Sequence, residues 1–292
     1  MKVAFTLTPN SQGIFRVVDA LGKYSPSEVE FVQSEEEADV VVMSVTGRRD
    51  KALAKLEDIL SKNKKPVVIQ YAVRSTQKPH TKEWSELWRK AHLTWSYYNL
   101  NLYCEEDSIS PEFNFYHAPL GVESEVFSRK FEYSIKDYVI ATNSLSYLTE
   151  SVREVIAAAA RLNETVFYLG EELDIPNVTC RTSISDEELS YYYNHSIFVS
   201  GLRRKEGFEL PAVEGLFCGA RPIFFDQPHY RQWFNDFGIF IPETPREAVI
   251  DNLEDIFKNT YRPVSDEEIE RANDIFNWKK IVPEFWRRVI ES

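Results

Sequence analysis

The feature that most constrains the fold of this chain is a repeated alternation of short apolar runs with segments whose apolar residues have helical spacing. Apolar runs of strand length are found at residues 2–8, 29–33, 39–45, 65–73, 137–143, 165–170, 196–202 and 221–226. Helical spacing is found at residues 11–24, 50–62, 81–95, 150–162 and 185–195. Parallel strands need a crossover connection, and a helix usually supplies it. The alternation therefore predicts an α/β fold with mainly parallel sheets.

The alternation runs in two series, and the second series begins after about residue 125. A chain of 292 residues is long enough for two domains of modest size. We therefore expect two Rossmann-like domains. In such folds ligands bind at the carboxyl ends of the strands, so we expect the site in a cleft between the two domains.

The composition predicts a cytoplasmic protein without a structural metal. Hydrophobic residues make up 43% of the chain, but no apolar run is long enough to cross a bilayer. The first residues, MKVAFTLTPN, have the pattern of a strand rather than of a signal peptide. The three cysteines, Cys104, Cys180 and Cys218, are far apart and share no metal-ligand spacing. Such a set is typical of reduced thiols.

Charge is unevenly distributed along the chain. The net charge is -12, which argues against binding of nucleic acid over the whole surface. Between Arg48 and Lys90, however, twelve Lys and Arg residues stand against five acidic residues. This basic segment is either a set of solvated helix faces or a docking surface for an anionic partner.

The stretch RRKEGFELPAVEGLFCGARPIFFD, residues 203–226, combines several groups that bind phosphate. Three cations, at 203–205, follow an expected strand. Pro211 suits the first turn of a helix, and Gly219 suits its end. The free N–H groups at the start of that helix would lie beside the cations, and this arrangement favours an anion.

Two glutamates of the same stretch, Glu206 and Glu214, add acceptors for sugar hydroxyls. The stretch EGFELPAVEGLFCGARPIFFD resembles the nucleotide-sugar signature of glycosyltransferase family 4, in which seven residues separate two glutamates. Three further segments are similar to parts of that family and keep their order: PLGVESEVF (119–127), ISDEELSYYYNHSIFV (184–199) and FNWKKIVPEFWRRVI (276–290). The resemblance covers mainly residues 116–290.

The resemblance implies a GT-B fold and a glycosyltransferase that retains the anomeric configuration. It implies an N-terminal acceptor domain at 1–122, a nucleotide-sugar domain at 123–275 and a helix at 276–292 that packs back on the N-terminal domain. The donor would be a nucleotide diphosphate sugar, with UDP-sugars favoured, and would carry a hexose or a pentose. No permanently bound cofactor and no metal are implied.

The same resemblance assigns roles to single residues. Glu206 would contact the donor sugar and Glu214 the ribose hydroxyls. The remaining donor-binding residues of the segment would be Gly207, Phe208, Glu209 and Leu210, largely through backbone N–H groups.

A pair of cations that the family uses for the leaving diphosphate is missing from its usual place. That place, after the first strand of the second domain, contains TNSLSYLTESVRE instead of an Arg followed after four residues by a Lys. We therefore move the role to Arg203, Arg204 or Lys205. We expect Arg203 and Lys205 to act with Glu206 in catalysis and Arg204 to bind the donor, and Arg153 is a weaker candidate.

The N-terminal half contains weaker candidates. Gly13 matches part of a glycine-rich loop that in the family faces the donor phosphates, although an ordinary turn explains it as well. Arg16 and His80 are candidates for the acceptor side. In the C-terminal half, His229 lies in a loop that either borders the nucleotide or faces solvent. The tryptophans Trp84, Trp88 and Trp95 either pack in a core or form an acceptor platform or a membrane-seated face, and core packing is favoured.

The acceptor is left open by the sequence. A hydroxylated base of phage-type modified DNA suits the basic segment, and a glycan or a membrane-associated acceptor is the alternative. Two other function classes also remain: a non-catalytic GT-B-like module that binds a nucleotide, and an epimerase of the same shape. The segment LTWSYYN (93–99) resembles part of the inverting fucosyltransferases, but the Glu206–Glu214 spacing disagrees with that family.

Overall fold

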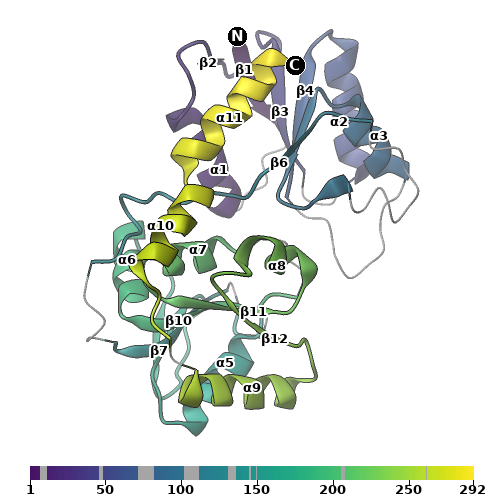
Figure 1. Ribbon diagram of the computed structural model, residues 1–292. Coiled ribbons are helices and arrows are strands. Elements are labelled where there is room, and N and C mark those ends of the chain that lie inside the picture. Colours follow the sequence, from purple (N-terminus) through teal and green to yellow (C-terminus); the bar gives the residue numbers. More distant parts are fainter. Residues whose placement is uncertain are drawn as a thin grey trace. The chain divides into compact units, whose positions relative to one another are not determined.

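The computed structural model describes residues 1–6, 12–45, 49–71, 82–101, 112–130, 136–144, 146–148, 150–204, 208–260 and 262–292. The chain forms two compact units. Unit 1 joins Met1–Gly121 to the C-terminal segment Trp278–Ser292, and unit 2 contains Val122–Arg204 and Glu209–Asn277. Each unit contains a six-stranded parallel sheet with helices between the strands (Figure 1). The predicted α/β class with two Rossmann-like parts is therefore confirmed.

Unit 1 is built on the strand order β2-β1-β3-β4-β5-β6. Its strands are β1 (Lys2–Thr6), β2 (Glu30–Phe31), β3 (Val40–Val45), β4 (Lys65–Gln70), β5 (Leu93–Ser96) and β6 (Phe115–His117). Its first three helices are α1 (Gln12–Lys23), α2 (Arg49–Ser61) and α3 (Lys82–Lys90). All six residues of β3 are buried, as expected for a central strand that is covered on both faces.

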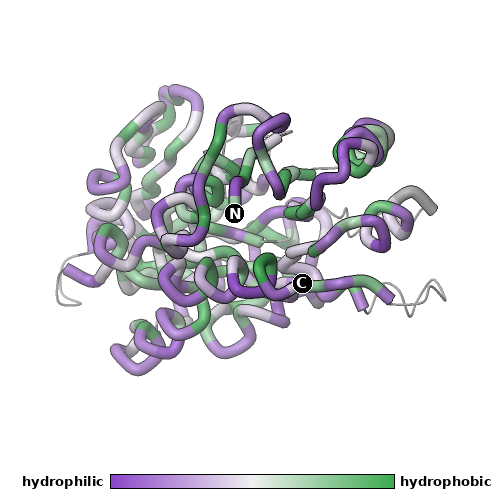
Figure 2. Tube along the Cα trace, turned by 90° about the horizontal axis from the view of Figure 1, so that it is seen from above, coloured by the Kyte–Doolittle hydropathy of each residue, from purple (hydrophilic) through white to green (hydrophobic). Residues whose placement is uncertain are grey.

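The C-terminal helix α11 (Trp278–Glu291) belongs to the core of unit 1. The Trp286 indole N–H donates to the carbonyl of Leu21 at 3.0 Å, and the Tyr116 hydroxyl donates to the carbonyl of Ile281 at 3.1 Å. In Figure 2 this helix, which ends at the mark C, carries both hydrophilic and hydrophobic residues. Its apolar side is buried, which explains why the end of the chain returns to the first sheet.

Unit 2 is built on the strand order β12-β11-β10-β7-β8-β9. Its strands are β7 (Tyr138–Asn143), β8 (Val166–Leu169), β9 (Val178–Arg181), β10 (Ser196–Gly201), β11 (Arg221–Phe225) and β12 (Ile239–Ile241). Its helices are α5 (Val152–Arg161), α6 (Asp186–Asn194), α7 (Leu210–Phe217), α8 (Pro228–Phe234), α9 (Arg246–Asn259) and α10 (Asp266–Ile275). Side chains of α5 and α9 form one hydrophobic cluster with the sheet, and α7 packs on β10 and β11.

Local sequence signals explain the ends of two helices in unit 2. Ser185 caps α6 through a capping box with Glu188, as its sequence predicts. Pro211 lies in the first turn of α7, where its missing N–H has no cost. Gly219, just after α7, has φ of +89°, a conformation that glycine adopts without strain.

The predicted helix at residues 81–95 is wrong in its second half. Helix α3 ends at Lys90, and Trp95 lies in β5, which pairs with β4 and β6. The helical spacing of Trp95 with the preceding tryptophans is a coincidence, because the run LTWS has strand-forming residues that a parallel neighbour on each side can bury. Thr81, the first residue of the predicted helix, lies outside the described residues.

The three tryptophans of this region pack in the core. Trp84, Trp88 and Trp95 are 3%, 1% and 0% exposed. The Trp95 indole N–H donates to the carbonyl of Ala118 at 3.0 Å, and its ring lies 5.2 Å from that of Phe285. The acceptor-platform interpretation is therefore wrong, since no ring face is left for a ligand.

In the described part of the chain no helix is long and apolar enough to span a membrane.

Close packing of α7 on the sheet requires Gly215. A Cβ atom built on Gly215 would lie 2.6 Å from Cγ1 and 2.7 Å from Cβ of Val199 in β10. A residue with a side chain would push α7 away from β10, and α7 carries the candidate residue Glu214. The absence of a side chain at Gly215 therefore allows the close distance between α7 and β10.

We predict that Gly215→Ala destabilises the protein by about 1–3 kcal/mol, because the added methyl overpacks the contact with Val199. The control is Gly22→Ala in α1, where a Cβ would meet nothing within 4 Å. This control should be neutral or stabilising by up to about 1 kcal/mol, since alanine is the better helix former. Urea unfolding of both variants checks this, and equal effects would contradict the packing argument.

Candidate functional site

The carboxyl ends of β7, β10 and β11 meet at one edge of the unit 2 sheet, because these strands are parallel neighbours. The predicted cationic loop follows β10 at this edge. Helix α7 starts there at Leu210, so its first N–H groups face the same side as the loop. The local order of strand, cationic loop and helix is the one predicted from the sequence.

Arg203 is tied to a buried carboxylate. Its Nε lies 3.1 Å from Oε2 of Glu209, whose side chain is 2% exposed. Its Nη2 donates to the carbonyl of Asn143 at the end of β7, at 3.0 Å. The Tyr230 hydroxyl lies 3.3 Å from Oε1 of Glu209 and 3.2 Å from the carbonyl of Arg203. This network joins the loop after β10 to β7 and to α8.

Arg204 turns to different partners. Its Nη1 donates to Oγ of Ser151 at 2.8 Å, at the start of α5. Two carboxylates lie farther off, Glu154 at 3.7 Å from Nη2 and Glu243 at 3.5 Å from Nε. The guanidinium lies over the ring of Phe225 at 4.8 Å, a cation–π contact. Arg204 thus lies where α5, β11 and the segment after β12 come together.

The second glutamate of the motif, Glu214, is buried in α7 at 2% exposure. The Tyr193 hydroxyl of α6 donates to its Oε2 at 3.4 Å. Phe208 and Leu210 are also buried. The Glu214 carboxylate thus already accepts a hydrogen bond from one hydroxyl group.

Several predicted residues lie outside the described part of the chain. They are His80, Lys205, Glu206 and Gly207.

The other candidates are placed in one helix of unit 1 and two of unit 2. Gly13 and Arg16 lie in α1, Gly13 in its first turn and Arg16 about one turn later, half-buried. Arg153 in α5 lies over the ring of Tyr147 at 5.9 Å. His229 is buried in α8, whereas both interpretations placed it in a loop: Pro228 starts a helix whose Tyr230 and Phe234 pack against Phe224 of β11.

The sequence analysis missed the two side chains that contact Arg203, namely those of Glu209 and Tyr230. Glu209 was considered for its backbone N–H, not for its buried side chain, and Tyr230 was not considered at all. The available signal was an acidic residue, Glu209, that follows the two arginines closely in the sequence. An acidic residue next to a strand end and two arginines favours an ion pair.

Four cations of the basic segment, Lys55, Lys62, Lys64 and Lys90, make polar contacts within unit 1. Lys55 lies 2.6 Å from Glu35, and Lys62 lies 2.9 Å from Asp58. Lys64 donates to the carbonyls of residues 36 and 38, and Lys90 pairs with Glu57 at 2.7 Å. These contacts favour the solvated-face interpretation of the segment over a docking surface.

Within the described ranges no group of three or more His, Cys, Asp or Glu residues is arranged so that it could hold a metal ion. Cys180 and Cys218 are free thiols, and Cys104 lies outside those ranges.

No family model and no curated protein matches the sequence. Solved structures match over the whole chain. A sucrose-phosphate synthase from Thermosynechococcus elongatus has a TM-score of 0.75 at 12% identity and covers 100% of this chain and 99% of its own. HepE from Anabaena, solved in complex with UDP, has a TM-score of 0.74 at 10% identity, with 100% of both chains covered. The lipopolysaccharide outer core galactosyltransferase WaaB has a TM-score of 0.66 at 12% identity and covers 100% of this chain and 99% of its own.

These identities are low, so the likeness shows the fold. The chain has the GT-B glycosyltransferase fold that the sequence resemblance implies. Membership of family 4 in particular stays a prediction.

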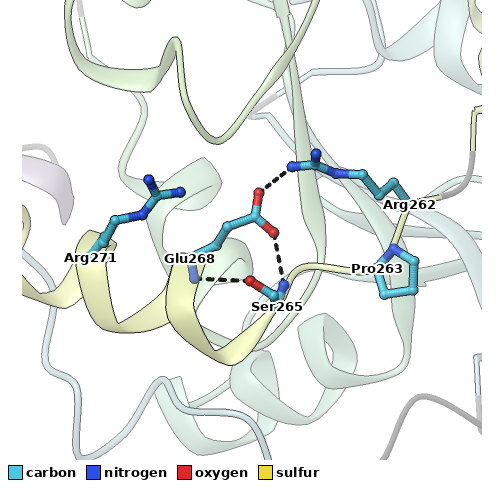
Figure 3. Close-up of a pocket in the computed structure, with 5 residues that line it drawn as sticks. All are labelled: Arg262, Pro263, Ser265, Glu268 and Arg271. Atoms are coloured by element: carbon cyan, nitrogen blue, oxygen red, sulfur yellow. Dashed lines mark hydrogen bonds and ion pairs between the residues drawn. The ribbon is translucent and has the colours of Figure 1, made fainter.

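A surface hollow of ≈ 360 Å³ in unit 2 lies away from the cationic loop. It is lined by Arg262, Pro263, Ser265, Glu268 and Arg271 (Figure 3). Glu268 accepts hydrogen bonds from Arg221, the first residue of β11, at 3.1 and 2.9 Å. Because Arg221 starts its strand, the hollow lies at the amino edge of the sheet, opposite the cationic loop.

Glu268, which lines the hollow, forms a buried ion pair with Arg221. Burial opposes ionisation of Glu268, but the bonds from Arg221 and from the backbone of Ser265 outweigh it and lower its pKa to about 2. The folded-state pKa is thus below the ordinary value of 4.5. The stabilisation is fully present above about pH 4.5 and is lost as the pH falls toward 2.

We predict that Arg221→Met destabilises the protein by about 3–5 kcal/mol at pH 7, because it leaves the Glu268 carboxylate buried without its main partner. The control is Arg262→Met, which removes a partner whose side chain is 68% exposed and should cost less than about 1 kcal/mol. Urea unfolding at pH 7 and at pH 3 checks both. The effect of Arg221→Met should shrink at pH 3, and an effect that grows at pH 3 would contradict the assignment.

Proposed function

We propose that this protein is a retaining glycosyltransferase that moves a hexose or a pentose from a nucleotide diphosphate sugar to a hydroxyl acceptor. The observation that carries the proposal is the carboxyl edge of the unit 2 sheet. There the loop of Arg203 and Arg204 and the start of α7 lie together. UDP is the favoured nucleotide, since HepE, with the same fold, was solved in complex with UDP.

Roles at the donor site follow the sequence motif. Glu214 accepts hydrogen bonds from the ribose hydroxyls, and Glu206 contacts the donor sugar. Backbone N–H groups of residues 207–210 hold phosphate or sugar oxygens, and a cation of the loop at residues 203–205 offsets the charge of the diphosphate. Gly13 of the N-terminal domain is assigned to the donor phosphates.

The chemistry requires charge stabilisation rather than a side-chain base. The bond between the anomeric carbon and the phosphate oxygen breaks, and both of its electrons leave with the diphosphate. Fixed cations and helix N–H groups stabilise this negative charge. The acceptor oxygen bonds to the anomeric carbon on the same face, and its proton passes to the departing phosphate oxygen.

The proposed reaction uses no metal and no permanently bound cofactor. Arg and Lys side chains take the role that a divalent cation has in other sugar transferases. Activity should therefore persist in the presence of a chelator.

The acceptor side is proposed for residues 1–122, with Arg16 and His80 as candidate contacts. A hydroxylated base of modified DNA remains one candidate acceptor. Lys62 and Lys90 pair with Asp58 and Glu57, which are already among the five acidic residues of the segment, so these ion pairs leave its positive balance unchanged. A glycan or a membrane-associated hydroxyl acceptor is the alternative.

We predict that Glu214→Gln weakens UDP binding at least about tenfold, because a charge-assisted hydrogen bond to the ribose is lost. The matched control is Glu267→Gln, an exposed glutamate on α10, which should leave UDP affinity unchanged. Isothermal titration calorimetry with UDP gives both affinities, and unfolding without ligand shows whether the variant is folded. Equal UDP affinity of Glu214→Gln and wild type would remove Glu214 from the site.

We also predict that transfer from a UDP-sugar gives a product with the anomeric configuration of the donor. Incubation with a panel of UDP-sugars and hydroxyl acceptors, including hydroxymethylated DNA, followed by NMR of the product, tests this. Transfer to DNA should fall steeply with salt, and transfer to a neutral acceptor should not. Inversion would overturn the retaining mechanism. UDP binding without transfer or hydrolysis would favour the non-catalytic module, and epimerised donor would favour an epimerase.

A further inference from the structure

We propose that the two adjacent arginines have separate tasks: Arg204 binds the donor diphosphate, and Arg203 is the structural partner of Glu209. This inference rests on the proposed function, because it names which cation of the loop meets the leaving group. The evidence for it is that the Arg203 and Arg204 side chains have different contacts in unit 2.

The Arg203 side chain is held by contacts within unit 2. The Glu209 carboxylate beside it is 2% exposed, and a buried carboxylate stays charged only with a close cation. Nε of Arg203 faces this carboxylate and Nη2 bonds the carbonyl of Asn143. Tyr230 bonds both Glu209 and the Arg203 backbone. Turning Arg203 toward a ligand would leave Glu209 buried without its cation.

Arg204 is held more loosely but is well oriented. Among the described residues its hydrogen bond goes to a neutral group, the hydroxyl of Ser151 at 2.8 Å. Glu154 and Glu243 lie at 3.7 and 3.5 Å, beyond the 2.7–3.2 Å usual for an N–H···O bond. The ring of Phe225 supports the guanidinium plane from one side. Its side chain is 33% exposed, so a ligand can reach it.

These contacts give Arg204 the properties of an anion ligand. A guanidinium offers several N–H donors in one plane and can bind two phosphate oxygens together. Its orientation is set in advance by Ser151 and Phe225, so little side-chain entropy is lost on binding. A diphosphate carries more charge than either distant carboxylate and can replace both as the partner of Nε and Nη2.

The position of Arg204 also accounts for the missing cations after β7. The strand ends at Asn143 and is followed by Ser144, with no Arg or Lys at that point. Arg204 comes from the next loop in the sheet, yet its guanidinium bonds Ser151 at the start of α5. It therefore brings a positive charge to the segment between β7 and α5 from a different place in the sequence.

The test compares UDP with uridine as probes. Arg204→Met should weaken UDP binding about 10- to 100-fold and change uridine binding less than about threefold, because only UDP carries the diphosphate. Arg204→Lys should recover part of the loss, since it keeps the charge but not the planar fork. Calorimetry on the full chain measures each affinity.

The companion variant is the double substitution Arg203→Met with Glu209→Gln. It removes both charges together, and the amide introduced at position 209 can still bond the Tyr230 hydroxyl. We expect UDP affinity within about threefold of wild type, because neither removed charge meets the diphosphate. The single variant Arg203→Met should lower the unfolding temperature, and adding Glu209→Gln should restore most of it.

The outcomes separate this inference from the proposed function. If the wild-type chain binds neither UDP nor another nucleoside diphosphate, the proposed function fails and this inference fails with it. If wild type binds UDP and Arg204→Met binds it equally well, the assignment to Arg204 alone is wrong. If the double variant loses UDP affinity as Arg204→Met does, then Arg203 also meets the diphosphate and the division of tasks is overturned.

Discussion

Parallel pairing of the strands is the constraint on which the rest of this structure depends. Each pair of neighbouring strands in the two six-stranded sheets, as far as the structure describes them, runs in the same direction. All strands of a sheet therefore end at one edge, and the loops that follow them meet there. In unit 2 this brings Arg203 and Arg204 after β10 to Asn143 at the end of β7 and to Ser151 before α5. The residues are some 50 to 60 positions apart in sequence, and only the sheet makes them neighbours.

Two buried carboxylates lie at opposite edges of the unit 2 sheet, and each is paired with an arginine. Glu268 at the amino edge is enclosed by Arg221, Arg262 and the cap of α10, and this network joins β11 to the helix. Glu209 at the carboxyl edge is enclosed by Arg203 and Tyr230. In both pairs a buried carboxylate has an arginine beside it, as a buried charge requires. What distinguishes the carboxyl edge is the second arginine, whose carboxylate contacts are long.

The accuracy of the sequence predictions depended on how local each signal is. The helix predicted at residues 185–195 and the helix end at Gly219 are decided by a few neighbouring residues, and both are found as expected. The extent of the helix before Trp95 was wrong, since apolar spacing alone cannot separate a helix from a helix followed by a buried strand. The partners Glu209 and Tyr230 could not be predicted, because a buried ion pair shows only as two charged residues in the sequence.

The sequence by itself determined the α/β class with its two series of elements, the place of the cationic loop before a proline-led helix, and the resemblance that implies a nucleotide-sugar donor. These properties follow from periodicity, capping and local chemistry, which act over a few residues. Only the tertiary structure decided that Arg203 pairs with a buried carboxylate while Arg204 bonds a hydroxyl group and stays partly exposed. Burial is the physical reason: the cost of an unpaired charge depends on its surroundings, and these come from β7, α5, α8 and the segment after β12, far from the loop in sequence.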